Sequence, residues 1–191
     1  SDVYKRQVDT QPQNILKLTD GESKDKRGEK LILNGMARDY FQRENLTKGL
    51  KDASSEDLIL ISDLDEIPNL ESLNFKEINN NIVIFEQKMF YYKFNLFYND
   101  FIWQGTKATK NKNFISPQWL RNIKDRKFPF YRLDTLFSKT KYINIKFIND
   151  GGWHFTNIKS AAEIHYKLRS YLHHIEFEAN PLSQDEIQSI I

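Results

Sequence analysis

Short apolar runs through the middle of the chain predict β-strands. Residues 57–62 contain four consecutive apolar residues followed by acids, which is typical of a buried strand in a parallel α/β sheet. Further strands are expected at 82–87, at 89–97 with many aromatic side chains, at 142–148 and at 153–155. The turn signal NDGG at 149–152 separates the last two strands.

Helical spacing of apolar residues is clearest at 160–173, where these residues recur every three to four positions. A looser apolar face covers 35–53. Ser116 followed by Pro117 is typical of the start of a short helix. The segment SQDE at 183–186 is typical of the cap of a last helix.

These elements contain no internal repeat and predict one α/β domain over 35–191. Residues 1–34 are expected to be a poorly defined N-terminal segment, with a solvated loop at 24–30 where the charges alternate. A chain of 191 residues with 39% hydrophobic and 28% charged residues can bury a core of its own. Cysteine is absent, which excludes disulfides and thiolate metal sites.

Charge and motif content exclude several classes of function. The net charge is only +2 and the basic residues are spread along the chain, so no nucleic-acid partner is expected. Neither GxGxxG nor GxxxxGK(S/T) occurs, which removes the main support for dinucleotide or P-loop binding. No run approaches the roughly 18 apolar residues of a membrane span, so no transmembrane segment is expected. This favours a cytoplasmic setting of bacterial or viral type, with peripheral membrane attachment left open.

An acidic turn follows the first predicted strand and is the most informative feature of the chain. Asp63, Asp65 and Glu66 lie within four positions, and Pro68 then prevents regular continuation. Clustered carboxylates repel one another and commonly mark a bound cation. Residues i and i+2 of extended backbone point the same way, so Asp63 and Asp65 can converge on one Mg²⁺ or Mn²⁺ ion. The alternative is a solvated acidic turn.

Four other polar residues are candidates for a site. His154 follows the Gly-Gly turn and is expected to be a metal or diphosphate ligand, or else a hydrogen-bonded core histidine. Asp150 is a candidate general base, although a turn-initiating aspartate explains it equally well. Glu176, three residues after His173, could polarise an acceptor at a helix end, where interaction with the helix dipole is the alternative. Arg43 could pair with the acidic turn or a phosphate, or simply face solvent.

Aromatic residues form a band that could stack on sugar rings. Alternating positions on a strand usually place one side in the core, so Tyr92 or Trp103 is expected to face a ligand. The band comprises Phe90, Tyr91, Tyr92, Phe94 and Trp103.

Residues 61–68 (ISDLDEIP) closely resemble the signature of glycosyltransferase family 17, the family of the β-1,4-mannosyl-glycoprotein β-1,4-N-acetylglucosaminyltransferase. Other segments resemble the family in the same order along the chain and extend the resemblance over about 35–180. They are RDYFQREN at 38–45, YYKFN at 91–95, WQG at 103–105, GGWHFT at 151–156 and KLRSYLH at 167–173.

The resemblance implies an inverting transferase of the GT-A type, a Rossmann-like fold in which helices flank a mixed sheet. It implies a UDP-sugar donor, most simply UDP-GlcNAc, a Mn²⁺ or Mg²⁺ ion and a glycan acceptor such as a protein N-linked glycan. Asp65 would contact the metal, Asp63 the metal or ribose, and Glu66 would orient the turn or reach the sugar. Animal members of the family are Golgi proteins.

The chain departs from this family's pattern at its N-terminal end. Only residues 1–56, mostly polar, precede the strand that leads to the acidic turn. A GT-A fold usually has a nucleotide-binding half before this strand, so an N-terminally truncated member is expected.

Two other functions compete with a transferase. A haloacid-dehalogenase-type phosphatase also places D-x-D after a buried strand, but Ile67 stands where that family has Thr or Val. A non-catalytic carbohydrate-binding remnant would suit the many aromatic residues and the short N-terminal part.

Overall fold

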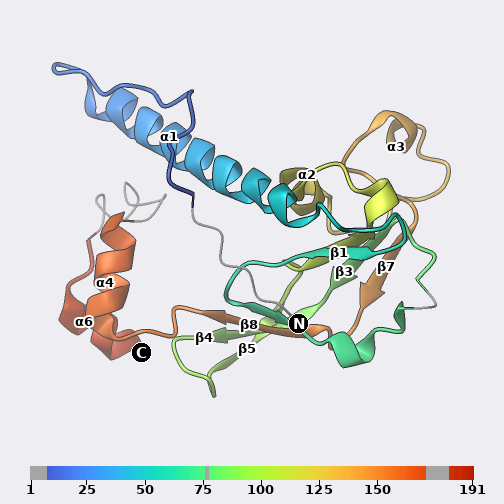
Figure 1. Cartoon of the computed structure of the whole chain (residues 1–191). Coiled ribbons are helices and arrows are strands. Elements are labelled where there is room, and N and C mark those ends of the chain that lie inside the picture. The colour runs from blue at the N-terminus through green and yellow to red at the C-terminus, as the bar shows by residue number, and fades with distance from the viewer. Residues whose placement is uncertain (1–7, 76–77, 171–180) are drawn as a thin grey trace. The chain divides into compact units, whose positions relative to one another are not determined.

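The structure is a computed structural model that describes residues 8–75, 78–170 and 181–191. The chain divides into two compact units, one formed by Ser1–Gly49 with Lys159–Ile191 and the other by Leu50–Ile158. The predicted boundary at residue 34 falls inside a helix of the first unit. Helices and strands together make a mixed α/β protein (Figure 1).

The regular secondary structure described in the first unit is all helical. It contains α1 (Lys24–Glu44), the 3-10 helix η1 (Asn45–Gly49), α4 (Ala161–Ser170) and α6 (Gln184–Ile190). The helix expected at 35–53 is confirmed over 35–49 by α1 and η1, but α1 begins at Lys24, so the loop expected at 24–30 was wrong. The start of α1 is set by the side chain of Ser23, which accepts a hydrogen bond from the Lys26 N–H, and its first turns are too polar for apolar spacing to reveal them.

The two predicted helix caps, at Ser116 and Ser183, are confirmed. Ser183 and Glu186 form a reciprocal capping box at the start of α6. Ser116 accepts from the Trp119 N–H at the start of α2 (Pro117–Asn122), with Pro117 in the first turn. The predicted helix at 160–173 is confirmed over Ala161–Ser170, and the rest of that range lies outside the described residues.

Within the described residues, the strands of the second unit form two four-stranded sheets. The first has the order β1-β6-β3-β7 and the second β2-β8-β4-β5. The strands are β1 (Leu58–Ile61), β2 (Glu66–Pro68), β3 (Ile82–Phe85), β4 (Gln87–Tyr91), β5 (Phe97–Trp103), β6 (Lys107–Lys110), β7 (Ile145–Ile148) and β8 (Gly152–Thr156). Short helices η2 (Leu70–Ser72), η4 (Asn111–Asn113), α2 and α3 (Asp134–Phe137) connect them.

Both sheets are mixed. β3 runs parallel to β7 and β4 parallel to β8, whereas β1 pairs antiparallel with β6 and β2 antiparallel with β8. The prediction of a parallel strand at 57–62 was therefore wrong. A run of apolar residues indicates that both faces of a strand are covered, which is true of β1. It does not indicate the direction of the neighbouring strand.

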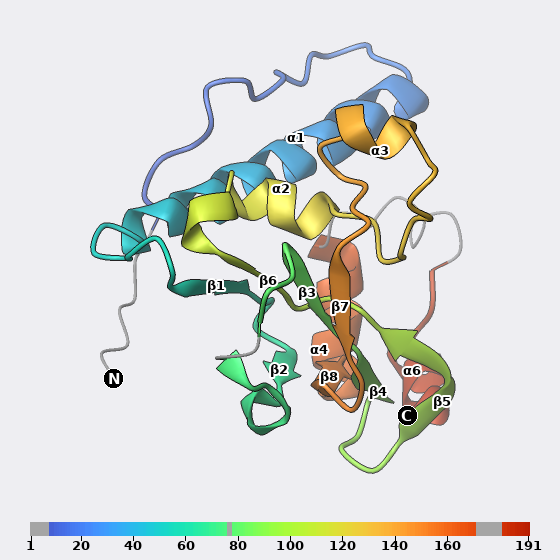
Figure 2. The same cartoon turned by 90° about the vertical axis from the view of Figure 1, so that its right-hand side faces the viewer.

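The core lies on both faces of the first sheet. On one face, Ile59 and Ile61 of β1 pack with Trp119 and Leu120 of α2. Figure 2 shows α2 lying over this sheet. On the other face, Val83, Phe85 and Ala108 join a second cluster of buried residues, to which Leu58 and Leu60 contribute from the edge. This packing fixes α2 against β1 and β6.

Neighbouring segments of the chain pass from the first sheet to the second. β3 continues into β4 through Glu86, and β7 continues into β8 through the turn at 149–151. Backbone hydrogen bonds join these crossings, from the Glu86 N–H to Ile148 O at 3.0 Å and from the Gly151 N–H to Glu86 O at 2.8 Å. The acidic turn makes the same crossing, from β1 to β2, so it lies at the junction between the sheets.

Candidate functional site

The acidic turn is a tight, internally bonded loop. The Glu66 N–H donates to Asp63 O at 3.1 Å, which closes the four-residue turn. In the other direction the Asp63 N–H donates to Glu66 Oε2 at 3.0 Å, and Ser62 Oγ donates to Glu66 O at 2.9 Å. The side chains of Asp63 and Asp65 are 41% and 44% exposed. The turn therefore presents both aspartates while its backbone is fixed.

Glu66 is the buried hub of this turn. Its side chain is 0% exposed, and its carboxylate accepts hydrogen bonds from Trp103 Nε1 at 2.8 Å and Thr106 Oγ1 at 3.2 Å. Arg121 Nη1 adds contacts at 3.0 and 3.1 Å. A carboxylate with this many donors is fully occupied by the protein. Of its two predicted roles, the geometry matches orienting the turn.

Arg121 supplies the positive charge that this acidic cluster needs. Its Nη2 donates to Asp63 Oδ2 at 2.7 Å, and the same guanidinium donates to both Glu66 oxygens and to Gly105 O. The side chain is only 13% exposed. The planar fork of Arg121 thus links the turn to α2 and to the segment before β6. Sequence reasoning missed this residue.

Gly105 leaves the space in which Glu66 and Trp103 meet. A Cβ at this position would lie 1.8 Å from Glu66 Oε1 and 2.1 Å from Trp103 Nε1. Those distances are far below any non-bonded contact, so every side chain other than hydrogen would displace the Trp103–Glu66 hydrogen bond. The sequence analysis noted this glycine only as part of the WQG segment at 103–105, and the steric reason for a glycine there was not visible in the sequence.

Lys107 holds α2, and so Arg121, in place. Its buried Nζ donates to Arg121 O at 2.9 Å and to Ile123 O at 2.5 Å, and pairs with Asp125. These carbonyls lie at the C-terminal end of α2, where a cation is favourable. Burial lowers the pKa of the Lys107 ammonium, and the hydrogen bond to Asp125 opposes that shift.

We expect Lys107→Met to lower the free energy of unfolding by about 2–4 kcal/mol, because it leaves two buried carbonyls without donors. Urea unfolding followed by tryptophan fluorescence measures this change. Lys110→Met, on the same strand, is the control, because Lys110 only pairs with the exposed Glu56. A loss at Lys107 no larger than at Lys110 would contradict the anchoring role.

Asp65 and His154 meet across the β2–β8 ladder. Glu66 stands opposite His154 in the register, and the Phe155 N–H donates to Asp65 O at 2.9 Å. This brings His154 Nε2 to 3.5 Å from Asp65 Oδ2. The imidazole is 7% exposed and stacks on Trp103, with ring centroids 4.4 Å apart at 15°. The structure thus brings together two residues that the sequence had singled out separately.

The surroundings of His154 differ for its two nitrogens. Nε2 faces Asp65, whereas Nδ1 is buried and has no hydrogen-bond partner within the described residues. Metal-ligating histidines almost always donate their second ring N–H to an acceptor. The Asp65 carboxylate is therefore the better supported metal ligand of this pair.

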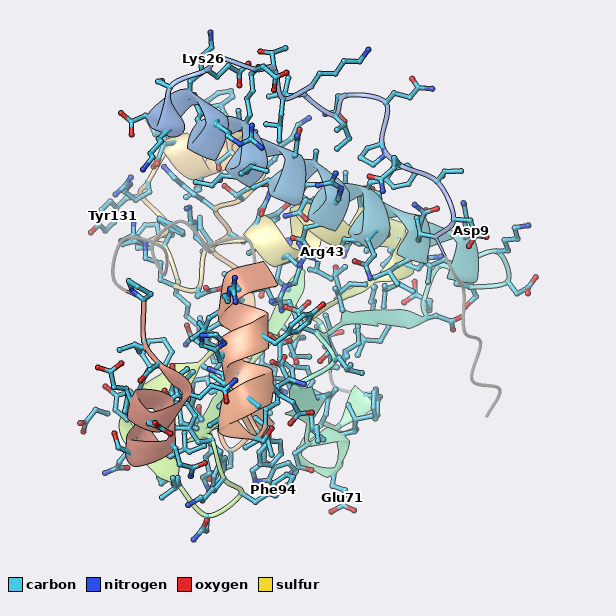
Figure 3. All side chains as sticks on the ribbon, turned by 90° about the vertical axis from the view of Figure 1, so that its left-hand side faces the viewer. Asp9, Lys26, Arg43, Glu71, Phe94 and Tyr131 are labelled. Atoms are coloured by element: carbon cyan, nitrogen blue, oxygen red, sulfur yellow. The ribbon has the colours of Figure 1, made fainter. Side chains whose placement is uncertain are left out.

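The remaining predicted residues are Asp150, Arg43 and Glu176. Asp150 is in the β7–β8 turn at a positive φ of 48° and pairs with Lys88 at 2.9 Å, at the end of β2 away from Asp65. This conformation suits the turn-forming alternative. Arg43 belongs to α1 of the first unit and pairs with Asp39 at 2.9 Å (Figure 3). Glu176 lies outside the described residues.

The Gly-Gly turn before His154 approaches protein rather than an open site. Gly152 has a φ of 130°, and a Cβ there would lie 2.1 Å from Ile67 O. The Asn69 N–H donates to Gly151 O at 2.8 Å. These glycines let β8 pass close to β2, which sets the register that places His154 beside Asp65.

Comparison of the chain with family models, with curated proteins and with solved structures found no match in any of the three. Among the described residues, no helix is long and apolar enough to span a membrane. In the same residues, no group of three or more His, Asp or Glu side chains is arranged to hold a metal ion. Any argument about function therefore depends on the site itself.

Proposed function

We propose that the chain is a metal-dependent, inverting glycosyltransferase of the GT-A type. It transfers a hexosaminyl residue, most simply GlcNAc, from a UDP-sugar to a glycan acceptor. The observation that carries the proposal is the fixed acidic turn with its half-exposed aspartates, in which Asp65 stands 3.5 Å from His154. A rigid support under exposed carboxylates is what a site for a metal-bound diphosphate requires.

The residues present fit a divalent ion that is shared with the substrate. Each ligand atom lies about 2.1 Å from a bound Mg²⁺, so two ligands of one ion are at most about 4.2 Å apart. The Asp65–His154 separation of 3.5 Å falls within that limit, but His154 Nδ1, which has no partner among the described residues, leaves Asp65 as the better supported protein ligand. Magnesium is commonly held by one or two carboxylates, with substrate phosphates and water completing its shell. Asp65 would hold the ion, with Asp63 beside it in contact with ion or ribose.

The chemistry divides between the metal and the protein. A divalent metal, when bound, supplies a Lewis acid that neutralises charge on the leaving diphosphate. Glu66, Arg121 and Trp103 keep the turn rigid, so that Asp65 needs no rearrangement to meet its ligand. Removal of the proton from the acceptor hydroxyl falls to a general base. The predicted candidate, Asp150, pairs with Lys88 at the end of β2 away from Asp65, so no described residue is assigned to this role.

The phosphatase alternative needs a nucleophilic aspartate in the same turn. Asp63 is poorly suited to that role, because Arg121 Nη2 donates a charge-assisted hydrogen bond to its Oδ2 at 2.7 Å. Such a bond stabilises the carboxylate and makes it a weaker nucleophile. The transferase proposal needs Asp63 only as an anionic neighbour of Asp65, which this ion pair permits.

The test is calorimetric titration of UDP-GlcNAc with and without Mn²⁺. We expect binding that needs the metal and is at least about tenfold weaker in Asp65→Asn, since a ligating carboxylate is lost. Glu71→Gln, an exposed carboxylate on η2 (Figure 3), is the matched control and should bind as the wild type does. His154→Phe keeps the stack on Trp103 and should weaken binding less than Asp65→Asn.

Two results would count against the proposal. Equal affinity of the wild type and Asp65→Asn would remove the metal assignment. Donor binding that persists unchanged in EDTA would do the same. In either case a hydrolysis assay with phosphomonoesters, which the transferase proposal expects to be negative, would decide for or against the phosphatase.

A further inference from the structure

The connection between β4 and β5 forms a pocket that the acidic turn does not use. The pocket has a volume of about 640 Å³. It lies within the second unit, at a hairpin of the second sheet whose tip carries Phe94 (Figure 3). Its lining residues are Tyr91, Tyr92, Asn95, Leu96, Phe97 and Tyr98.

Tyr92 adopts a strained backbone conformation at this pocket. Its φ is 63°, in the left-handed region that bulky residues avoid. The Lys93 N–H donates to Tyr91 O at 2.6 Å, which makes Tyr92 the centre of a γ-turn of the rare, positive-φ kind. The Tyr92 N–H donates to Thr156 O of β8 at 3.1 Å and holds the strained residue in place. Strain of this type clusters at ligand sites.

The tyrosine rings make a corner rather than a flat patch. Tyr91 and Tyr98 meet edge to face, with ring centroids 5.9 Å apart at 89°, and Tyr91 and Tyr92 are 5.6 Å apart at 49°. Burial raises the pKa of the Tyr91 hydroxyl, so the phenol stays a neutral donor. Asn95 adds an amide with two donors and an acceptor.

This lining suits an uncharged ligand with one apolar and one hydroxylated aspect. The six lining residues carry phenol, amide and hydrocarbon groups and no charge. Aromatic faces take up C–H surfaces, while phenol and amide groups exchange hydrogen bonds with hydroxyls. A mostly aromatic pocket with a few placed polar groups is typical of a small-molecule site, and this volume is within the usual range.

We propose that this pocket binds an uncharged saccharide of one or two rings, stacked on Tyr92 and Tyr98. In the proposed transferase this saccharide is the acceptor. The acceptor role rests on the proposed function, whereas saccharide binding itself does not. The rival occupant is a second copy of the chain, because β5 also exposes Phe101 and Ile102. The strained Tyr92 and the amide of Asn95 favour the saccharide, since edge-to-edge strand pairing needs neither.

The test uses saturation-transfer NMR and titration with N,N′-diacetylchitobiose, cellobiose and mannobiose, in EDTA and without nucleotide. At least one disaccharide should bind saturably. Tyr92→Gly and Tyr98→Ala should weaken its binding at least about tenfold, because each removes a stacking ring. Tyr131→Ala removes an exposed tyrosine outside the pocket and should bind as the wild type does.

Tyr92→Gly also separates a binding role from a structural one. Glycine accepts positive φ without strain, so this variant should keep its thermal midpoint within a few degrees while it loses the saccharide. A large drop of the midpoint with saccharide binding retained would make Tyr92 structural and overturn the proposal. Tyr98→Ala is a second test of saccharide binding, and it does not depend on the γ-turn at Tyr92.

Other outcomes separate this proposal from the proposed function. If no disaccharide binds, or if both pocket variants bind as the wild type does, the saccharide site is overturned, whatever UDP-GlcNAc does on the same samples. If the variants change self-association in sedimentation velocity and leave saccharide binding intact, the pocket is an interface between copies. If the pocket variants weaken saccharide binding but UDP-GlcNAc does not bind to the wild type, the saccharide site is supported and the transferase proposal is overturned.

Discussion

Glu66→Gln is expected to lower the free energy of unfolding by about 3–5 kcal/mol, the cost of breaking a buried ion pair from one side. The substitution keeps the shape of the side chain but removes its charge. It also turns one oxygen into an amide donor that faces the N–H groups of Arg121 and Trp103, which are donors themselves. Urea unfolding followed by tryptophan fluorescence measures the change directly.

The same residue pair offers a sharper test than the single variant. In Glu66→Gln, the Arg121 guanidinium keeps Asp63 but loses its buried partner. If the loss of stability comes from this half-removed pair, Arg121→Met in the Glu66→Gln background should recover part of it, because an ion pair replaced on both sides costs less than one that is half removed. A double-mutant cycle gives the coupling. Glu71→Gln should leave stability unchanged. A decrease in the free energy of unfolding below about 1 kcal/mol in Glu66→Gln would contradict the central role of Glu66 in the network, since solvent-exposed ion pairs contribute that little.

Sequence reasoning located the carboxylates of the site because they are neighbours along the chain. Asp63 and Asp65 stand two positions apart after an apolar run, and the run itself marks the strand that delivers them. His154 was marked by the turn before it. Local signals of this kind also placed the caps at Ser116 and Ser183, where one side chain and the next few residues decide the structure.

The residues that support the acidic turn were not predicted, because they are distant from it in the sequence. Arg121 is 58 positions from Asp63, and nothing in its own segment distinguishes it from other arginines of the chain. The direction of β1 escaped for a related reason, since it depends on β6 rather than on β1 itself. Lys107 was not singled out either, because its partners at the end of α2 are distant in the sequence. Contacts between residues far apart in the sequence decide these partners and strand directions, and a single sequence gives little information about such contacts.

The junction between the sheets explains why the site is where it is. Within the described residues, four connections cross between the sheets, namely β1–β2, β3–β4, β5–β6 and β7–β8. A crossing leaves backbone and side chains without the regular ladder that satisfies them inside a sheet. Glu66, Thr106 and Ser62 supply the missing partners: Ser62 Oγ and Thr106 Oγ1 are 2.9 Å apart, and both lie near the Glu66 carboxylate. The polar network that joins the two sheets is thus the same network that fixes the acidic turn.

Gly105→Ala is expected to damage both stability and donor binding with the smallest possible change in the chain. Its Cβ would fall 1.8 Å from Glu66 Oε1, so either Glu66 or Trp103 must move and their 2.8 Å hydrogen bond is lost. We expect about 2–4 kcal/mol of destabilisation, from a buried donor left unpaired and from overpacking. Unfolding in urea gives the stability, and titration with UDP-GlcNAc and Mn²⁺ gives the binding.

Two comparisons make the Gly105 prediction specific to the network. Gly49→Ala should leave stability close to that of the wild type, because nothing lies within 4 Å of the added Cβ. In the Glu66→Gln background, Gly105→Ala should cost less than it does alone, because the first change already weakens the network that the second disrupts and the effects of coupled substitutions are not additive. The overpacking part of the cost remains, since glutamine has the shape of glutamate. Full additivity would mean that Gly105 acts through some contact other than Glu66, and the acidic turn would then lose its proposed support.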